Sequence, residues 1–422
     1  MGDICFYKDS GVNMKKLVVT LGMALVCPAF AQNAAVFKLD DVNLKPIKLS
    51  EFIAQVKENN TWIRTKKLAN ESTASWQQSM SAYNLNPSFS YSRGTFYAQA
   101  PTDAFASRSP QSGTYALSGN IEGRGKQDAR KEFSGTELAR QSVDLGAMVY
   151  GVEVDSAFLF LDALRVKNLW LVKHKAQTEL EKMGNPDLKL AIDDYKQFKT
   201  DQANDFKYFS LGMASFLGKP SNVLPDPTAE LSVAPRDFDV RSLIDNARRS
   251  RPDILSLEAA FNVAKAGDVL AQKNRNLDYN VSVYGTDTPG YVGTYSGYST
   301  TYERGISYGF SVTVPIPISQ LYDADLVAAK NARLQAEIML EDAKNRVYFE
   351  VNQALLQFNS AKTKLQTALD NQKNLADKKM ANLDDVNNWH AAEVEAIDAK
   401  VNYAKALLFL GRVSGLKNVL AM

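Results

Sequence analysis

The sequence predicts a mixed fold in which long helical hairpins are joined to membrane-type β-strands. Three observations predict it. A stretch of 93 residues, Ile318 to Leu410, contains no Gly or Pro. Four short segments alternate apolar and small polar residues, and the two halves of the chain repeat each other at an offset of 191 to 193 residues. The first observation favours helix on a large scale, because Gly and Pro are the residues that most often interrupt one.

Composition sets the limits of the interpretation. The chain has 422 residues, 45% of them apolar, which is ordinary for a folded protein of two or three domains. The formal net charge is only +2. A nucleic-acid-binding protein would carry a larger positive charge, so no nucleic-acid partner is expected.

The N-terminal 31 residues are typical of a leader. Met14-Lys15-Lys16 precedes an apolar run from Leu17 to Val26, followed by Ala29-Phe30-Ala31. This is the order of a secretory signal peptide, with cleavage expected after Ala31. A short membrane anchor is the alternative. The thirteen residues before Met14 do not fit such a signal and indicate an upstream start codon or a cloning remnant.

Both cysteines, Cys5 and Cys27, precede the expected cleavage site. The mature chain is therefore expected to have no disulfide and no cysteine ligand. Cys27 as a lipidation site is an alternative, although Val26 is larger than the residue that usually precedes a lipidated cysteine. Beyond Ala31 no apolar run of about 18 residues occurs, so no transmembrane helix is expected there.

The first half of the chain then has a clear element order. A helix is predicted from Leu49 to about Tyr83, where Asn86-Pro87 stops it. Two alternating segments follow, and then a helical region from about Lys126 to Phe216, interrupted near Gly184-Asn185-Pro186. A Pro-rich linker comes next.

The same order begins again after the linker. Phe52-Ile53 matches Leu243-Ile244, Ser90 matches Ser282, Tyr115 matches Tyr308, and Phe216-Leu217-Gly218 matches Phe409-Leu410-Gly411. Four matches in order indicate a duplicated unit. We therefore divide the chain into a leader and signal peptide (1–31), a first repeat (32–222), a linker (223–238), a second repeat (239–415) and a tail (416–422).

The four alternating segments are the candidate strands. Each is about ten residues long, with one aromatic-rich apolar face and one small polar face, and they lie at Pro87 to Tyr97, Thr114 to Glu122, Tyr279 to Thr286 and Ile306 to Val314. This length and alternation are typical of transmembrane β-strands, which are apolar toward lipid and polar toward a lumen. A soluble sandwich is the alternative, since half-buried strands also alternate.

A bilayer imposes a further condition on these strands. Four strands cannot close a barrel, and an open edge is not tolerated where water is absent. Several copies of the chain must then share one barrel. The connection from Asp287 to Gly305, with four tyrosines among Gly, Ser and Thr, is expected to be an outward-facing loop near the lipid headgroups or a plain surface loop.

The long run from Ile318 to Leu410 admits two interpretations on its own. Apolar residues from Val347 to Leu375 recur in steps of three and four, which places them on one helical stripe. A coiled-coil stalk or a set of bundle helices would show this pattern. The repeat instead predicts that the run is a second hairpin, with its turn within about Lys378 to Asn388.

Over essentially the whole mature chain the sequence resembles the TolC-like outer-membrane efflux proteins. The resemblance is carried by Arg251-Pro252-Asp253-Ile254 at a helix start, by Gly309 to Pro317 leading into the long helix, and by Asn402-Tyr403 to Gly411. Pro suits the first turn of a helix, and Asp there meets the positive end of the helix dipole.

The resemblance implies a homotrimer in which each chain donates four strands to a twelve-stranded transmembrane barrel, with a long α-helical hairpin barrel continuing from it. It implies an exit channel in the outer membrane of a Gram-negative bacterium, with a large periplasmic portion and outer-membrane lipid around the strands. It further implies passive conduction in a tripartite efflux or type I secretion system, with a periplasmic adaptor and an inner-membrane transporter as partners.

The resemblance also assigns candidate residues at the two hairpin turns. Asp384 and Asp385 fall where some members carry a ring of carboxylates, which would attract cations and respond to pH. Two solvated carboxylates at a helix turn are the alternative. The candidate adaptor contacts at the hairpin tips are Met183, Gly184, Asn185, Met380 and Leu383. The resemblance would place a second ring acid at the position of Ala381, and the second turn lacks a Gly; both are departures from the expected pattern.

Other functional classes find less support. The only histidines, His174 and His390, lie in helical stretches and are expected on exposed helix surfaces. No paired-His motif and no Gly-x-Ser-x-Gly occurs, so no catalytic, cofactor or metal site is predicted. A periplasmic adaptor and a coiled-coil structural protein without channel activity remain as alternatives. An adaptor would carry one hairpin flanked by other domains, and a coiled coil would need no strands of bilayer length.

Overall fold

The structure is a computed structural model. It describes residues 43–84, 86–95, 111–218, 223–229, 236–288, 291–295, 298–302, 304–315, 321–376, 378 and 380–416. The leader, with Cys5, Cys27 and the expected cleavage site, lies outside the described residues. So do residues 230–235 of the linker and nearly all of the tail.

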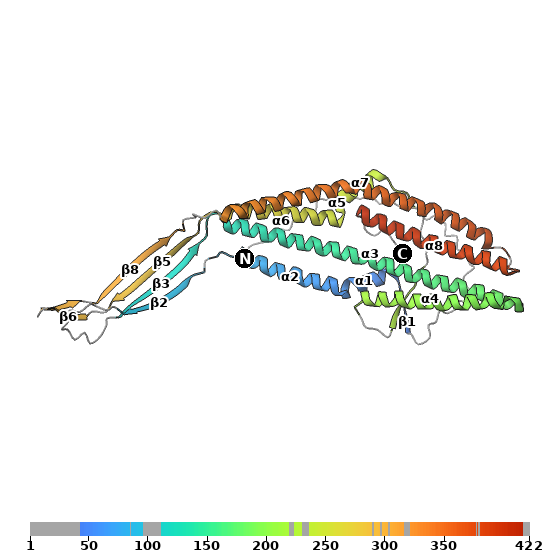
Figure 1. Cartoon of the computed structure of the whole chain (residues 1–422), viewed down its shortest axis with the longest axis horizontal. Coiled ribbons are helices and arrows are strands. Elements are labelled where there is room, and N and C mark those ends of the chain that lie inside the picture. Colours follow the sequence, from blue (N-terminus) through green and yellow to red (C-terminus); the bar gives the residue numbers. More distant parts are fainter. Residues whose placement is uncertain are drawn as a thin grey trace, which may run out of the picture. The chain divides into compact units, whose positions relative to one another are not determined.

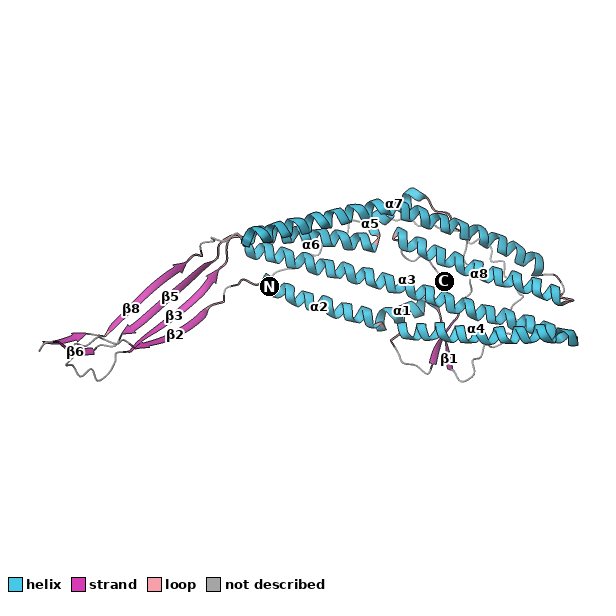
Figure 2. Cartoon of the chain, in the orientation of Figure 1, coloured by secondary structure: helices cyan, strands magenta, loops and turns pink. Residues whose placement is uncertain are grey.

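Helices make up most of the described chain (Figures 1 and 2). They are α1 (Leu49–Asn59), α2 (Thr61–Ser81), α3 (Lys126–Met183), α4 (Lys189–Phe216), α5 (Val240–Ser250), α6 (Pro252–Asn274), α7 (Leu321–Ala376) and α8 (Leu383–Ser414). The α3 and α7 helices have 58 and 56 residues, so each is about 85 Å long. Among the described residues, no helix has a stretch long and apolar enough to span a bilayer.

The element lengths repeat between the two halves. Helices of 11 and 21 residues (α1 and α2) precede the first strand pair, and helices of 11 and 23 residues (α5 and α6) precede the second. A long helix and a shorter one then form a hairpin in each half, α3 with α4 and α7 with α8. The duplication seen as a sequence offset therefore corresponds to a duplicated order of elements.

Four strands form one antiparallel sheet in the order β2-β3-β5-β8 (Figure 2). They are β2 (Ser88–Thr95), β3 (Gln111–Ile121), β5 (Tyr279–Thr288) and β8 (Gly305–Thr313). The register is set by pairs such as Leu117 with Val283 and Val283 with Phe310. These are the four segments that the alternation predicts, to within three residues at the ends that the structure describes.

The two faces of this sheet differ in chemistry. One face carries exposed apolar side chains, among them Phe89, Leu117, Val283, Tyr308 and Phe310. The other carries small polar residues that bond across the strands, with Ser88 to Ser118 at 2.7 Å, Thr114 to Thr286 at 3.1 Å, Asn280 to Asn120 at 2.7 Å and Ser282 to Ser311 at 2.8 Å. An apolar face of this extent needs a cover other than water.

Tyrosine rings on this sheet lie over glycines of the neighbouring strand. Tyr91 lies over Gly113, Tyr308 over Gly285, and Tyr284 over Gly309 on the polar face. A side chain at Gly309 would overlap the Tyr284 ring. The glycines are therefore needed for space, since a flat aromatic ring occupies the volume above them.

Two shorter strand pairs correct the sequence interpretation. β1 (Asn43–Ile47) pairs in parallel with β4 (Val223–Pro227), so part of the segment interpreted as a linker is a strand. β6 (Tyr291–Tyr295) pairs with β7 (Tyr298–Tyr302), so the connection interpreted as a loop contains a β-hairpin. Pro in β4 and Gly in β6 are unusual in strands, and β4, β6 and β7 have only five residues each, so a search for alternating apolar residues misses all three.

The predicted first helix is also divided. Asn60 ends α1 and caps α2, its side-chain oxygen accepting hydrogen bonds from the backbone N–H groups of Trp62 (3.0 Å) and Ile63 (3.3 Å). Its amide also donates to the Phe216 carbonyl of α4. Asn is among the strongest N-capping residues, and this is why the helix restarts here without a Gly or Pro.

Most of the apolar stripe of the long run is buried. Val347, Val351, Leu355, Phe358 and Leu365 of α7 belong to one core with residues of α5, α6 and α8. A second core joins α1, α3, α4 and α8. Because α8 contributes to both, it ties the two halves of the chain together.

The Tyr284–Gly309 contact gives a stability prediction. Gly309→Ala should lower the free energy of unfolding by about 1–3 kcal/mol, because the new methyl group displaces the Tyr284 ring. Gly305→Ala in the same strand is the matched control, since no described atom lies within 4 Å of the added carbon. Thermal unfolding followed by circular dichroism measures both. Equal melting temperatures for the two variants would contradict the steric argument, and adding Tyr284→Ala should rescue Gly309→Ala.

Candidate functional site

The first hairpin turn joins α3 to α4 and is built by two residues with special geometry. Gly184 follows Met183 with φ of 63°, a left-handed conformation that glycine adopts without strain. Asn185 then accepts a hydrogen bond from the Asp187 backbone N–H at 3.0 Å and starts a 3₁₀ turn, η2 (Pro186–Leu188). Gly184 and Asn185 are exposed, whereas Leu188 points into the protein and is buried.

The second turn joins α7 to α8. The two predicted gate carboxylates differ here, since one takes part in the helix cap and the other is exposed. Asn382 caps α8 by accepting a hydrogen bond from the Asp385 backbone N–H at 2.8 Å. The Asp385 carboxylate in turn accepts one from the Ala381 N–H at 3.1 Å. This reciprocal arrangement is close to a capping box. Asp384 is exposed and makes no hydrogen bond among the described residues.

The two turns are held together by one apolar cluster. It contains Ala176, Leu180, Leu188, Tyr195, Val386 and Trp389, with Met183, Met380 and Leu383 packed against it. Three of the five predicted tip residues, Met183, Met380 and Leu383, are thus partly buried by contacts within the chain. Only Gly184 and Asn185 are fully available to a partner.

A polar contact within this cluster links α4 directly to α8. The Tyr195 hydroxyl donates a hydrogen bond to the Asn387 side chain at 3.1 Å, and the Tyr195 ring lies edge-on to His390 with centroids 5.2 Å apart. The Nε2 atom of His390 is buried without a hydrogen-bond partner. Burial, together with the charge of Lys173, lowers the pKa of His390 to about 4.

The prediction that His390 lies on an exposed helix surface is therefore wrong. Its helix position gives no sign of burial, because the residues that cover it come from α3 and α4. His174 is partly exposed, stacked on Trp170 and 3.2 Å from the Lys199 ammonium. Burial and the nearby Lys199 charge lower the pKa of His174 as well.

Ion pairs between α3 and α8 continue away from the turns. Arg165 bonds Asp398 at 2.6 Å, Lys405 bonds Asp162, and Arg412 lies 3.3 Å from Asp155. All six side chains are partly exposed, so each pair contributes about 0–1 kcal/mol. Each pair joins opposite charges, which favours this register of the two helices over its neighbours but adds little stability.

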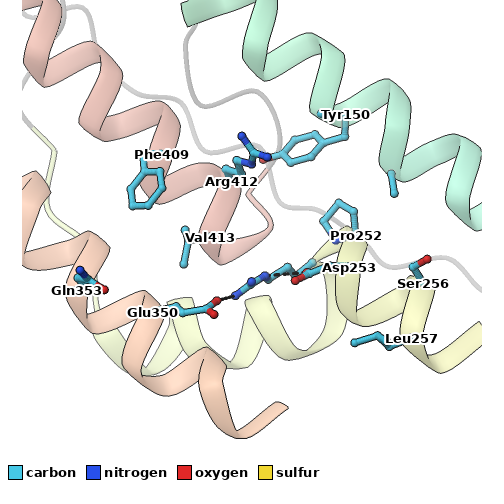
Figure 3. A pocket seen from close by; sticks show the side chains of 13 residues that line it. Tyr150, Pro252, Asp253, Ser256, Leu257, Glu350, Gln353, Phe409, Arg412 and Val413 are labelled. Atoms are coloured by element: carbon cyan, nitrogen blue, oxygen red, sulfur yellow. Dashed lines mark ion pairs between the residues drawn. The ribbon is translucent and has the colours of Figure 1, made fainter. Parts of the chain in front are cut away.

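The Arg-Pro-Asp motif lies at an open pocket of about 810 Å³ between α3, α6, α7 and α8 (Figure 3). Arg251 bonds Asp253 at 2.7 Å and also Glu350 of α7. Phe409 and Arg412 of α8 and Tyr150 of α3 line the opposite side. Since Arg251 pairs with both Asp253 and Glu350, the motif fastens the start of α6 to α7.

Among the described residues, no group of three or more His, Cys, Asp or Glu side chains is placed to hold a metal ion. The described chain combines two helical hairpins, whose turns are joined by an apolar cluster, with a four-stranded sheet that has one apolar and one polar face. This combination of elements defines its fold class.

Several solved membrane-protein structures have a similar fold. The chain is similar to CusC, with a TM-score of 0.67 and 12% identity over 90% of this chain and 95% of that one. It is similar to the MtrE outer-membrane channel of Neisseria gonorrhoeae, solved in its open state (TM-score 0.63, 16% identity, 87% and 89% of the two chains). It is also similar to a membrane protein from Pseudomonas aeruginosa (TM-score 0.64, 16% identity, 87% and 93%).

No protein-family model and no curated protein sequence matches the chain. The likeness to the solved channels at this low identity shows the fold. At the level of the fold, the resemblance to TolC-like outer-membrane proteins is confirmed, as is the mixture of long helices with a small number of strands.

The capping geometry predicts that Asp384 and Asp385 contribute differently to stability. Asp385→Ala should cost about 1 kcal/mol of unfolding free energy because the Ala381 N–H loses its partner. Asp384→Ala is the matched control, since both residues lie in the first turn of α8 and lose the same dipole interaction. Chemical denaturation measures the difference. Equal effects would show that the cap is not the stabilising feature.

The partly buried His390 ring predicts that the stability depends on pH. Because its pKa in the folded protein, about 4, lies below the ordinary value of 6.5, the folded state binds the proton less readily. Its contribution to stability is present above pH 6.5 and is lost as the pH falls toward 4. His390→Phe keeps the ring contact with Tyr195 and removes the titration. Melting temperatures of this variant should fall less between pH 7 and pH 4; the same slope as wild type would contradict the assignment.

Proposed function

We propose that the chain is the outer-membrane exit channel of a Gram-negative bacterium, conducting substrates passively from an inner-membrane transporter across the periplasm and outer membrane. It would serve a tripartite efflux or a type I secretion system. It is not an enzyme in this proposal, and energy comes from the transporter. The observation that carries the proposal is the sheet β2-β3-β5-β8, apolar on one face and polar on the other.

Strand lengths and faces support the membrane assignment. The strands have 8, 11, 10 and 9 residues, and tilted strands of about 9–11 residues cross a bilayer. The apolar face would contact lipid, and the face of Ser, Thr and Asn would line water. In lipid an isolated sheet with two open edges would leave backbone groups unpaired, which costs several kcal/mol for each group.

Three copies of the chain would satisfy this requirement with twelve strands. The fold shared with solved outer-membrane channels supports this arrangement. The helical hairpins would then form a periplasmic tunnel, and their turns would face a periplasmic adaptor and the transporter. Gly184 and Asn185 are the tip residues with most surface left for the adaptor, while Met183, Met380 and Leu383 would contribute what the apolar cluster leaves exposed.

At the closed end Asp384 is the stronger candidate for a gate carboxylate. Three copies would bring three exposed carboxylates around the axis, which would attract cations and favour their passage. Asp385 would contribute indirectly, since its carboxylate is engaged in the cap.

Membrane fractionation tests the proposal as a whole. Expressed with its leader in a Gram-negative host, the chain should appear in the outer membrane as a trimer and should form pores in planar bilayers. A soluble monomer would overturn the proposal. A monomeric adaptor or a coiled coil would give no pores in this assay.

The gate assignment has its own test in the same bilayers. Asp384→Asn should lower cation selectivity, measured as a shift in reversal potential across a salt gradient, and should weaken block by added divalent cations. Asp187→Asn in the first turn, which is also exposed, is the control. Unchanged selectivity and block in Asp384→Asn would remove this residue from the gate.

A further inference from the structure

The apolar face of the sheet carries one row of residues that includes charged side chains. Strand pairing places Arg93, Gly113, Asp287 and Ile306 side by side in this row, which we call the charged row. Among the residues of this face whose side chains the structure describes, Arg93 and Asp287 are the only charged ones. The charged row lies toward the strand ends that are not joined to helices.

The two charges of the row are in different states. Arg304, just before β8, binds both carboxylate oxygens of Asp287, with its Nε donating to Oδ1 at 2.7 Å. Arg93 is exposed and makes no hydrogen bond or ion pair with another described residue. Two guanidinium groups therefore accompany one carboxylate, and the apolar face has a net positive charge at this level.

A gap lies beside Arg93 in the charged row. Gly113, the next residue in the row, has no side chain, and the Tyr91 ring lies over it. The Tyr91 hydroxyl oxygen is 3.5 Å from the point where a Cβ atom of Gly113 would lie. Packing against Tyr115, with ring centroids 4.8 Å apart, holds the Tyr91 ring in this position. A phenol donor thus borders the gap, and the Arg93 guanidinium can reach it from the side.

The height of the charged row in a membrane follows from strand geometry. Asp287 lies eight residues after Tyr279, the first residue of β5. At about 3.4 Å per residue and a tilt of about 35–45°, this separation corresponds to about 20 Å along the membrane normal. The apolar band of outer-membrane barrels is about 25 Å tall. The charged row would therefore lie near the outer boundary of the band, where an arginine extends its guanidinium to the headgroups.

We infer that Arg93 and the Tyr91 hydroxyl bind a phosphate group of a glycolipid in the outer leaflet, with Arg304 at the same level. The inference rests on the proposed function, because only then does this face contact lipid. A guanidinium binds phosphate through two parallel hydrogen bonds. The rows nearer the helices are apolar and would be covered by acyl chains. The anion that meets Arg93 is therefore one attached to acyl chains, and the outer leaflet of a Gram-negative outer membrane consists largely of phosphorylated glycolipid.

Binding of lipid A, an acylated disaccharide with two phosphates, tests the site directly. The purified trimer in detergent is titrated with lipid A, and native mass spectrometry counts the lipids bound to each trimer. Arg93→Gln should weaken binding about tenfold, because a charge-assisted pair of hydrogen bonds is lost. Arg93→Lys should restore only part of the affinity, because an ammonium binds phosphate as a point charge. Tyr91→Phe keeps the ring contact with Tyr115 and should weaken binding by a smaller factor.

A matched control moves the arginine to the other face without changing the composition of the chain. The exchange Ser92→Arg with Arg93→Ser turns the guanidinium from the apolar to the polar face, because successive residues of a strand point to opposite sides. This variant should bind lipid A as weakly as Arg93→Gln. Oligomer mass and circular dichroism of both variants should match those of the wild type.

The remaining outcomes separate this inference from the proposed function. Dephosphorylated lipid A should bind wild type and Arg93→Gln equally weakly. Equal binding of intact lipid A by these two proteins would overturn the inference, while a trimer with pores would leave the channel proposal standing. Inorganic phosphate that displaced lipid A at equal concentration would overturn the assignment to a lipid, because the acyl chains would then add nothing. A soluble monomer would overturn both proposals.

Discussion

Pairing of the backbone N–H and C=O groups at the edges of one small sheet is the constraint on which the rest of this structure depends. The two inner strands, β3 and β5, are each paired with a strand on both sides. At β2 and β8 one edge of each strand is open within the chain. In water such edges would be an aggregation hazard, whereas in lipid they would be too costly to leave unpaired. Assembly is therefore a condition of placing this sheet in a membrane.

The residue types on the two faces of the sheet also fit a position in a membrane. Apart from the Tyr284 ring, the polar face consists mainly of Ser, Thr, Asn and Gly, and its Ser, Thr and Asn side chains bond across the strands. The apolar face combines aromatic rings with glycines, as in Tyr308 over Gly285. A face of mainly small polar residues and a face rich in aromatic rings would suit a wall with water on one side and lipid on the other.

Periodicity made much of this fold predictable. The strands were found because each alternation is local, and the stripe around Val351 and Phe358 because its period of three and four is also local. The pairing of β1 with β4 was missed because it joins segments about 180 residues apart, and because Pro225 and Pro227 are unusual in strands. The break at Asn60 was missed because one capping side chain replaces the usual Gly or Pro.

The candidate site was less predictable for a related reason. Sequence position brought Asp384 and Asp385 to the second turn but could not separate them, because the difference depends on which carboxylate reaches the Ala381 N–H. Burial of His390 depends on Tyr195, a residue 195 positions earlier in the chain. Sites formed by residues from three helices are specified by packing, and no single stretch of sequence contains that information.

Contacts within the second turn differ from those between the two hairpins, and this difference constrains how the hairpin ends could move. Asp385 and Asn382 hold the start of α8 as a unit. Near the turns, α8 contacts the first hairpin through the apolar cluster, the hydrogen bond from Tyr195 to Asn387 and the Lys175 ammonium over the Trp389 ring. A net hydrogen bond contributes about 0.5–1.5 kcal/mol, and each partly exposed ion pair farther along α8 contributes less. Separation of the two hairpin ends would therefore break weak side-chain contacts while both turns keep their internal geometry. Most of the resistance would come from burying Leu188, Val386 and Trp389 against one another. A partner that covered those apolar surfaces as they became exposed could open this end without unfolding either helix.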